Sequence, residues 1–147
     1  MGREIRYQGA ILKDDHILLI LLHAMKMGKT YWLIPGGGIE EGETEEECVI
    51  REMKEETNLD VQVVRLILDE PSPAEGIYKW NKTYLCEPVG GAASPGHEPE
   101  PEARDYIISQ VKWFDLRDDS EWGPKLMENP FTYPILQGIR KVLGYSE

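Results

Sequence analysis

The sequence predicts an α/β sandwich, because segments with strand-like patterns alternate with two amphipathic helical segments. The first helical segment runs from about Glu45 to Thr57. The second lies within Pro130 to Gly144, where Ile135, Ile139 and Leu143 recur at helical spacing and predict a terminal helix packed on the sheet. With 147 residues, 41% hydrophobic and 29% charged, the chain fits one globular domain with one core.

The N-terminal part predicts a β-hairpin followed by a third strand. Two apolar runs between Glu4 and His23 are separated by the polar turn at Asp14–Asp15, and the second run predicts a buried strand. The apolar run Tyr31–Ile34 ends at Pro35. The three glycines that follow cannot continue a strand, and they allow a ligand to approach the backbone closely.

Three further segments predict strands by their β-branched and aromatic content: Val61–Leu68, Ile77–Glu87 and Tyr106–Leu116. In the second of these, alternation places Tyr78, Trp80 and Tyr84 on one face. Aromatic residues at this period usually pack in the core or across strands, and stacking on a nucleobase is the alternative.

The first helix has a sequence signal at each end. Thr44 followed by Glu47 has the form of a capping box, in which each side chain satisfies a backbone amide of the other residue. Acidic residues in the first turn favour the positive end of the helix dipole. Asn58 stands where a residue with positive φ ends a helix. The helix is therefore expected over Glu45 to Thr57.

This helix is expected to have a face of carboxylates. Glu52, Glu55 and Glu56 share that face with Glu45, and an apolar face carries Val49, Ile50, Met53 and Thr57. Like charges at this spacing repel, so a partly enclosed face favours a bound cation. Oxygen ligands suit Mg²⁺ or Mn²⁺. Arg51, four residues before Glu55, can orient one of the carboxylates without occupying the metal site.

Each glutamate taken alone is equally typical of a solvated helix face, so the longer pattern decides. Gly37 is followed by five residues, Glu43, seven residues, and then Arg51 to Leu59 with the sequence REMKEETNL. This pattern over residues 37–59 resembles the signature of the Nudix hydrolases. The one departure is Asn58 in place of glycine, and asparagine can supply the left-handed backbone conformation needed there.

The resemblance implies a single Nudix domain over residues 1–147, with the Nudix fold, an α/β/α sandwich around a mixed sheet. It implies metal-dependent hydrolysis of a phosphoanhydride bond by Glu52, Glu55, Glu56 and Arg51. The metal ligands would be the three glutamates and the carbonyl of Gly36, and Arg51 would hold the glutamates in register. Substrate-binding residues would be Gly37, Gly38 and, near the second strand, His23. Glu43 is expected to support the loop or the start of the helix.

The resemblance also suggests a further carboxylate from beyond the signature, as general base or extra ligand. The Pro- and Gly-rich segment from Pro88 to Asp105 offers Glu98, Glu100 and Glu102, and the alternative is a simple surface loop. The residues before Trp113 are Ser109 and Gln110, where many relatives carry a glutamate. The sequence therefore leaves the identity of the base open.

The expected substrate is a small-molecule nucleotide: a nucleoside triphosphate or a nucleotide-sugar such as ADP-ribose. The alternative function is a non-catalytic, nucleotide-sensing Nudix-like binding module. A purely solubilising acidic helix would leave the glycine run and the full spacing unexplained. The resemblance is compatible with a homodimer, and the sequence does not decide this point.

The charge of the chain argues against polyanionic partners. Sixteen Lys and Arg residues face 27 Asp and Glu residues, for a formal net charge of −11, so no DNA duplex and no membrane surface is expected as a partner. Cys48 and Cys86 have neither metal-site nor disulfide-framework spacing and are expected to be ordinary thiols. Without a signal peptide or a membrane-length apolar run, the expected location is cytoplasmic.

Overall fold

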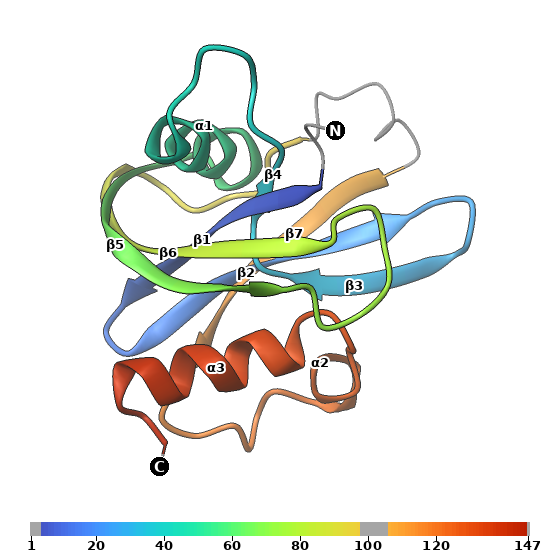
Figure 1. Ribbon diagram of the computed structural model, residues 1–147. Helices are drawn as coiled ribbons and strands as arrows, with labels where there is room; N and C mark the ends of the chain where they lie inside the picture. The colour runs from blue at the N-terminus through green and yellow to red at the C-terminus, as the bar shows by residue number, and fades with distance from the viewer. Residues whose placement is uncertain (1–3, 98–105, 147) are drawn as a thin grey trace.

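The computed structural model describes residues 4–97 and 106–146 and shows an α/β/α sandwich (Figure 1). Helix α1 covers one face of the sheet, and α2 and α3 lie on the opposite side. The strands are β1 (Ile5–Lys13), β2 (His16–Ala24), β3 (Lys29–Leu33), β4 (Gly36–Gly37), β5 (Leu59–Pro71), β6 (Trp80–Gly91) and β7 (Tyr106–Asp115). The helices are α1 (Glu45–Thr57), α2 (Pro124–Met127) and α3 (Tyr133–Leu143). The predicted α/β fold is confirmed.

The sheet is mixed, as predicted. Its strand order is β3-β2-β1-β6-β5, with β4 paired to β1 and β7 paired to β2. Strands β1 and β6 pair in parallel, and the other pairs are antiparallel. The predicted hairpin forms between β1 and β2, and its turn residues Asp14 and Asp15 adopt φ values of 52° and 65°. Short polar residues tolerate this left-handed conformation better than most.

Helix α1 has the predicted limits. The Thr44 side chain accepts a hydrogen bond from the Glu47 amide, the Glu47 carboxylate accepts one from the Thr44 amide, and Asn58 ends the helix with φ 63°. The predicted division into two faces is wrong. Ile50 is 41% exposed, whereas Glu52 and Glu56 are fully buried on the same face as the apolar residues Cys48, Val49 and Met53.

Two hydrophobic clusters fill the spaces above and below the sheet. The cluster on the α1 side includes Tyr7, Leu18, Val49, Met53 and Tyr84. The cluster on the α3 side includes Ile17, Phe114, Leu116, Leu136 and Ile139. Because α1 packs directly on the sheet, any charged group on its inner face is enclosed with it.

Three details of the strands differ from prediction. Gly36 and Gly37 form the two-residue strand β4, which pairs with Gln8 and Tyr7 of β1. Strands β5 and β6 extend to Pro71 and Gly91, because they pair with each other over most of their length.

Among the described residues, no helix is long and apolar enough to cross a membrane.

Candidate active site

The site is built where α1 lies across the two glycines of β4. The Gly36 amide donates a hydrogen bond of 2.9 Å to Glu56 Oε1, which ties the fully buried glutamate to the strand. A Cβ atom at Gly37 would lie 2.7 Å from Glu52 Cδ and would overlap the carboxylate. Glycine is therefore required at this point because the Glu52 carboxylate occupies the side-chain space. The sequence predicted close approach of a ligand to this backbone, and at Gly37 the group that lies close is a protein carboxylate.

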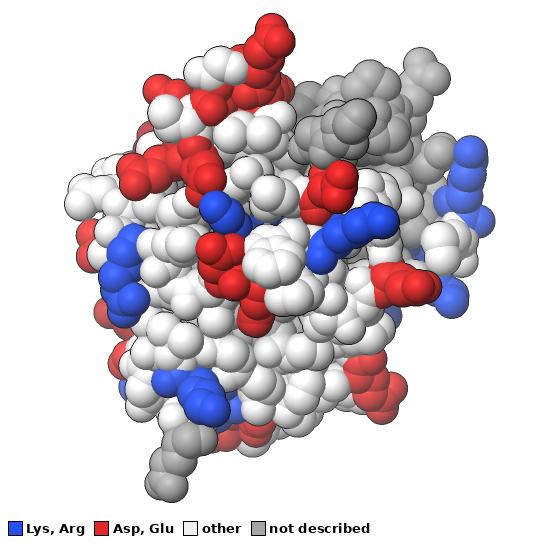
Figure 2. All heavy atoms as spheres, viewed as in Figure 1, with Lys and Arg blue, Asp and Glu red and all other residues white. Residues whose placement is uncertain are grey.

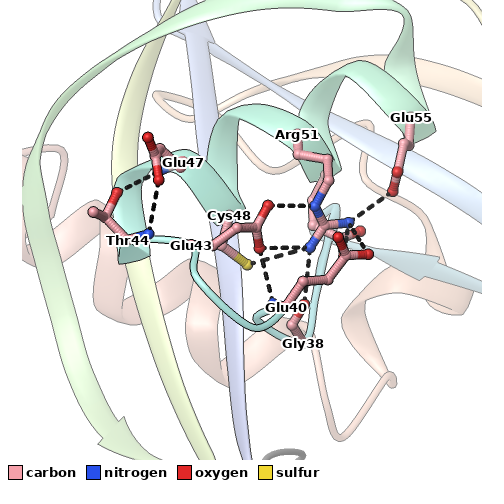
Figure 3. Close-up of polar contacts among 9 residues, drawn as sticks. Gly38, Glu40, Glu43, Thr44, Glu47, Cys48, Arg51 and Glu55 are labelled. Atoms are coloured by element: carbon pink, nitrogen blue, oxygen red, sulfur yellow. Dashed lines mark hydrogen bonds and ion pairs between the residues drawn. The ribbon is translucent and has the colours of Figure 1, made fainter.

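Arg51 holds the acidic residues together (Figure 3). Its Nε and Nη2 donate to the two carboxylate oxygens of Glu43 at 2.6 and 3.0 Å, a bidentate pair. Its Nη1 lies 3.2 Å from Glu52 Oε2 and 3.1 Å from Glu55 Oε1. Nη2 also donates to the Gly38 carbonyl at 3.0 Å. One guanidinium thus fixes the loop, the start of the helix and two of the predicted site glutamates.

The electrostatics of this network differ from one carboxylate to the next. Hydrogen bonds from Arg51 lower the pKa of Glu43 below its usual value. Burial raises the pKa of Glu55 despite the nearby guanidinium. Burial also raises the pKa of the Cys48 thiol to about 12, so this cysteine is an inert core residue. The pKa of Glu43 is thus lowered and that of Glu55 raised, so Glu55 binds a proton more readily than Glu43.

Glu45 takes part in a separate contact. Its carboxylate accepts hydrogen bonds from Lys82 Nζ at 3.0 and 3.2 Å and a short one from the Tyr84 hydroxyl. These bonds fasten the start of α1 to β6, so Glu45 does not belong with the Arg51 network as the predicted face implied. The predicted alignment of Tyr78 with Trp80 and Tyr84 is wrong for Tyr78, which precedes β6. Trp80 and Tyr84 both lie in β6, and Tyr84 is buried in the cluster beneath α1.

The donor chemistry at α1 fits a hard divalent cation. Glu52, Glu55 and Glu56 offer only oxygen ligands, and hard cations such as Mg²⁺ prefer these. Their present arrangement has Glu55 bonded to Arg51 and Glu56 bonded to the Gly36 amide. Over residues 4–97 and 106–146, no three His, Cys, Asp or Glu side chains are gathered closely enough to form a ready-made metal cage.

Acidic side chains also gather on the surface around this site. In Figure 2 they cluster over α1 and the loop that precedes it, and Lys and Arg are spread over the rest of the visible face. Such a field repels an anionic substrate unless a cation is bound, because a bound divalent ion reverses the local charge. A metal-free site would therefore bind phosphates weakly.

The segment after β6 is fastened to the C-terminal end of α1. The amides of Ser94, Gly96 and His97 donate to the carbonyls of Thr57, Glu56 and Glu55 at 3.0, 2.9 and 2.9 Å. These carbonyls belong to the last turn of the helix, which has no further helical donors. No local pattern in the sequence predicts this docking. The candidates Glu98, Glu100 and Glu102 lie just beyond it, outside the described residues.

Replacing Gly96 with alanine is expected to release this segment. The new Cβ would overlap the Glu55 carbonyl oxygen and lie 2.7 Å from its carbon, and neither backbone can yield easily. Loss of the three hydrogen bonds should lower the free energy of unfolding by about 1–3 kcal/mol, measured by urea denaturation. Gly90→Ala is the matched control, because its Cβ would meet only the flexible Asp60 side chain at 3.2 Å. Equal stability of the two variants would contradict the docking.

A cavity of about 440 Å³ opens on the α3 side of β4. Gly36 and Gly37 form part of its wall, together with Arg6, Tyr78 and Phe131. Its walls are mostly apolar, and its size suits a small-molecule ligand. The two glycines therefore lie between the cavity and the buried glutamates. The predicted substrate residue His23 does not line this cavity, whereas its neighbours Leu22 and Ala24 do.

The polar residues of this cavity were not predicted from the sequence. Arg6, Gln8 and Asn81 come from β1 and β6, and only the parallel pairing of these strands brings them together. A polar residue inside a strand-like sequence was the only sequence signal for them. Without the strand pairing, this signal does not indicate which residues share a cavity.

The fold and the site define a class of α/β/α proteins in which buried glutamates of one helix abut a glycine strand at the edge of a ligand cavity. The chain belongs to the Nudix family: the NUDIX domain model matches residues 5–137. The signature at residues 37–59 lies within this match, so the resemblance seen in the sequence is confirmed.

Named relatives agree with this assignment. The chain is 30% identical over 116 residues to the ADP-ribose pyrophosphatase of Methanocaldococcus jannaschii, an alignment covering 78% of this chain and 63% of the relative. It is 30% identical over 113 residues to the NAD-capped RNA hydrolase NudC of Vibrio atlanticus, covering 77% of this chain and 38% of the relative. In both cases the aligned part is less than two thirds of the relative's length.

A solved structure supports the fold. The crystal structure of an ADP-ribose pyrophosphatase from Streptococcus suis is similar with a TM-score of 0.67 and 23% identity, over 100% of this chain and 95% of that one. At this level of identity the likeness concerns the fold alone.

Proposed function

We propose that the chain is a Nudix enzyme that hydrolyses a phosphoanhydride bond in a nucleoside diphosphate linked to another group. The proposed substrate is a nucleoside triphosphate or a nucleotide-sugar such as ADP-ribose. Relatives named as an ADP-ribose pyrophosphatase and an NAD-capped RNA hydrolase support a substrate of this kind. The requirement for Mg²⁺ or Mn²⁺ is part of the proposal.

One observation carries the proposal: two fully buried carboxylates, Glu52 and Glu56, are packed against a glycine strand that also lines a ligand cavity. Burying ionised groups is costly, and a protein surface needs no such arrangement for solubility. Buried carboxylates close to other charged groups are typical of functional sites. The alternative of a solvated acidic face is wrong for these two residues, although it holds for the exposed Glu46.

The proposed metal ligands are Glu52, Glu55, Glu56 and the Gly36 carbonyl. A bound Mg²⁺ or Mn²⁺ would neutralise phosphate charge and lower the pKa of the attacking water. Arg51 would keep Glu52 and Glu55 in place, and Glu43 would hold Arg51. Gly37 and Gly38 would let the phosphates approach the backbone of the strand and the loop.

The chemical step needs a water oxygen to attack phosphorus while the anhydride P–O bond breaks and a carboxylate takes the proton of the water. Among the described residues, Glu55 suits this role if Glu52, Glu56 and the Gly36 carbonyl hold the metal without it. Its side chain is 24% exposed, so water can reach it. Glu98, Glu100 and Glu102 remain the proposed alternatives from the adjoining segment.

The decisive experiment is a panel of nucleoside triphosphates, nucleotide-sugars and dinucleotides incubated with Mg²⁺ or Mn²⁺, with the released products identified. We expect one class to yield a nucleoside monophosphate or a phosphorylated sugar, and a chelator to abolish the turnover. A panel without turnover would reject the enzyme assignment.

The competing function is a nucleotide-sensing module without catalysis. The intact set Glu52, Glu55, Glu56 and Arg51 argues against it, because a binding module has no need for all four. Calorimetry on the same panel separates the two functions. Tight binding of an intact nucleotide without product release would favour the module.

A further inference from the structure

We propose that Asn81 determines substrate choice by hydrogen bonding the edge of a nucleobase in the cavity beside β4. This inference rests on the proposed function and adds the part of the substrate that the cavity selects. Asn81 lies near the start of β6, next to Arg6 of β1 in the parallel pairing. Its side chain lines the cavity and is only 4% exposed.

The Asn81 amide is the unusual polar group of this cavity. Within the described part of the chain, no side-chain hydrogen bond to Asn81 is found. Buried amides are nearly always hydrogen-bonded, because leaving one without a bond costs free energy. The Asn81 side chain is 4% exposed and lines the cavity, and its amide atoms are not among the fully enclosed polar atoms of the described residues that lack a partner, so the amide is accessible to a ligand that can supply the missing hydrogen bonds.

Three other polar side chains of the cavity wall are already engaged within the protein. Gln8 donates from Nε2 to Thr83 Oγ1 at 2.8 Å and accepts at Oε1 from Arg6 Nε at 3.2 Å. Arg6 also donates to the Ile34 carbonyl at 2.7 Å, and its guanidinium lies 5.8 Å from the centre of the Tyr78 ring. The Thr132 hydroxyl donates to the Trp32 carbonyl. These bonds hold a rigid wall around Asn81.

The composition of the wall favours a base over the other parts of a nucleotide. A sugar would bring several hydroxyl groups against apolar walls, where most of them would lose their hydrogen bonds. A phosphate would need more positive charge than Arg6 supplies. A planar base can pack between aromatic side chains such as Tyr78 and Phe131. Its edge offers a donor beside an acceptor, which matches the acceptor and donor of one amide.

The position of the cavity places such a base at a useful distance from the chemistry. Gly36 and Gly37 line the cavity, and the same two residues contact Glu56 and Glu52. A nucleotide with its base beside Asn81 can therefore extend its phosphates along β4 toward the glutamates. The amide would then select the nucleotide without taking part in bond cleavage.

The test compares the wild type with Asn81→Leu, which keeps the volume but removes both hydrogen-bonding groups. Two quantities are measured: kcat/KM across nucleotides with different bases, and the affinity for the corresponding nucleosides, which carry no phosphate, in the presence of chelator, by calorimetry. We expect the preference for the best base, and the affinity for its nucleoside, to fall about tenfold or more. The metal-free binding measurement does not depend on catalysis.

Trp80→Phe is the matched control. Trp80 is the preceding residue of the same strand, is 38% exposed, does not line the cavity, and bonds Asp69 through its indole nitrogen. Its replacement should leave base preference unchanged, and thermal melting checks that both variants are folded. Unchanged preference and affinity in Asn81→Leu would overturn the role of Asn81 while leaving the hydrolase intact. A wild type that neither binds nor hydrolyses any nucleotide would overturn both proposals.

Discussion

Replacing Glu56 with glutamine is expected to reduce turnover of the substrate roughly 100- to 1,000-fold, because it removes one buried negative charge from the proposed metal site. The change preserves shape, and the glutamine carbonyl can still accept the Gly36 amide hydrogen bond now made at 2.9 Å. Folding is therefore not the target of this substitution. The measurement is kcat/KM at saturating Mg²⁺.

The same substitution should make the metal-free protein more stable. Glu56 is fully buried, and an uncharged amide costs less to enclose than a carboxylate. Thermal melting in chelator should therefore show a higher Tm for Glu56→Gln than for wild type. Added Mg²⁺ should raise the Tm of wild type and have a smaller effect on the variant, because a ligand that binds the folded state stabilises it.

Glu46→Gln controls for the loss of one charge from the same helix. Glu46 is exposed in the first turn of α1, so its replacement should leave turnover and the response to Mg²⁺ close to wild type. If Mg²⁺ stabilises Glu56→Gln as strongly as wild type, Glu56 is not a metal ligand.

Local chemistry explains why helix α1 could be predicted to the residue. The capping box of Thr44 and Glu47 and the left-handed Asn58 depend only on neighbours within a few positions. The turn at Asp14–Asp15 is local in the same sense. At the ends of helix α1 and at this turn, the structure agrees with the prediction from the local sequence.

The burial of the glutamates could not be predicted in the same way. The position of Glu52 depends on Gly37, which β4 delivers through its pairing with β1. The predicted apolar face included Ile50, yet Glu52 and Glu56 are buried and Ile50 is 41% exposed. The rotation of helix α1 about its axis is set by its packing on the sheet, and the periodicity of the helix sequence alone does not determine it.

The cavity was hidden for a related reason. Arg6 and Asn81 are neighbours only because β1 and β6 pair in parallel across a long sequence separation. A sequence read in order gives no register for such a pair. The signature predicted the acidic residues of the site. The residues proposed to recognise the nucleotide are brought together only by the strand pairing in the sheet.

The second large effect is expected from Arg51→Met. Arg51 is 20% exposed and contacts Glu43, Glu52 and Glu55, whose exposures are 16%, 0% and 24%. Removing this cation leaves these carboxylates enclosed without it, which typically costs 3–5 kcal/mol for a buried pair. Allowing for the partial exposure of Arg51 and two of its partners, we expect a loss of about 2–4 kcal/mol at pH 7, measured by urea denaturation.

The loss should depend on pH with a defined sign. Hydrogen bonds from Arg51 lower the pKa of Glu43 in the folded state below 4.5, so the pair stabilises the fold above that pH. The contribution disappears as the pH falls through the lowered folded value, because both states then bind the proton. The difference between wild type and Arg51→Met should therefore be full at pH 7 and shrink below pH 4.5.

Arg117→Met is the matched control for the loss of an arginine. Arg117 contacts Asp115 and Asp15 from a side chain that is 55% exposed, where water screens the ion pair. Its replacement should change stability only slightly. A loss for Arg51→Met as small as that for Arg117→Met, or one that does not change with pH, would show that the guanidinium does not stabilise the enclosed carboxylates. The arrangement of Glu52 and Glu55 beside β4 would then need another support, because no packing contact alone keeps like charges together.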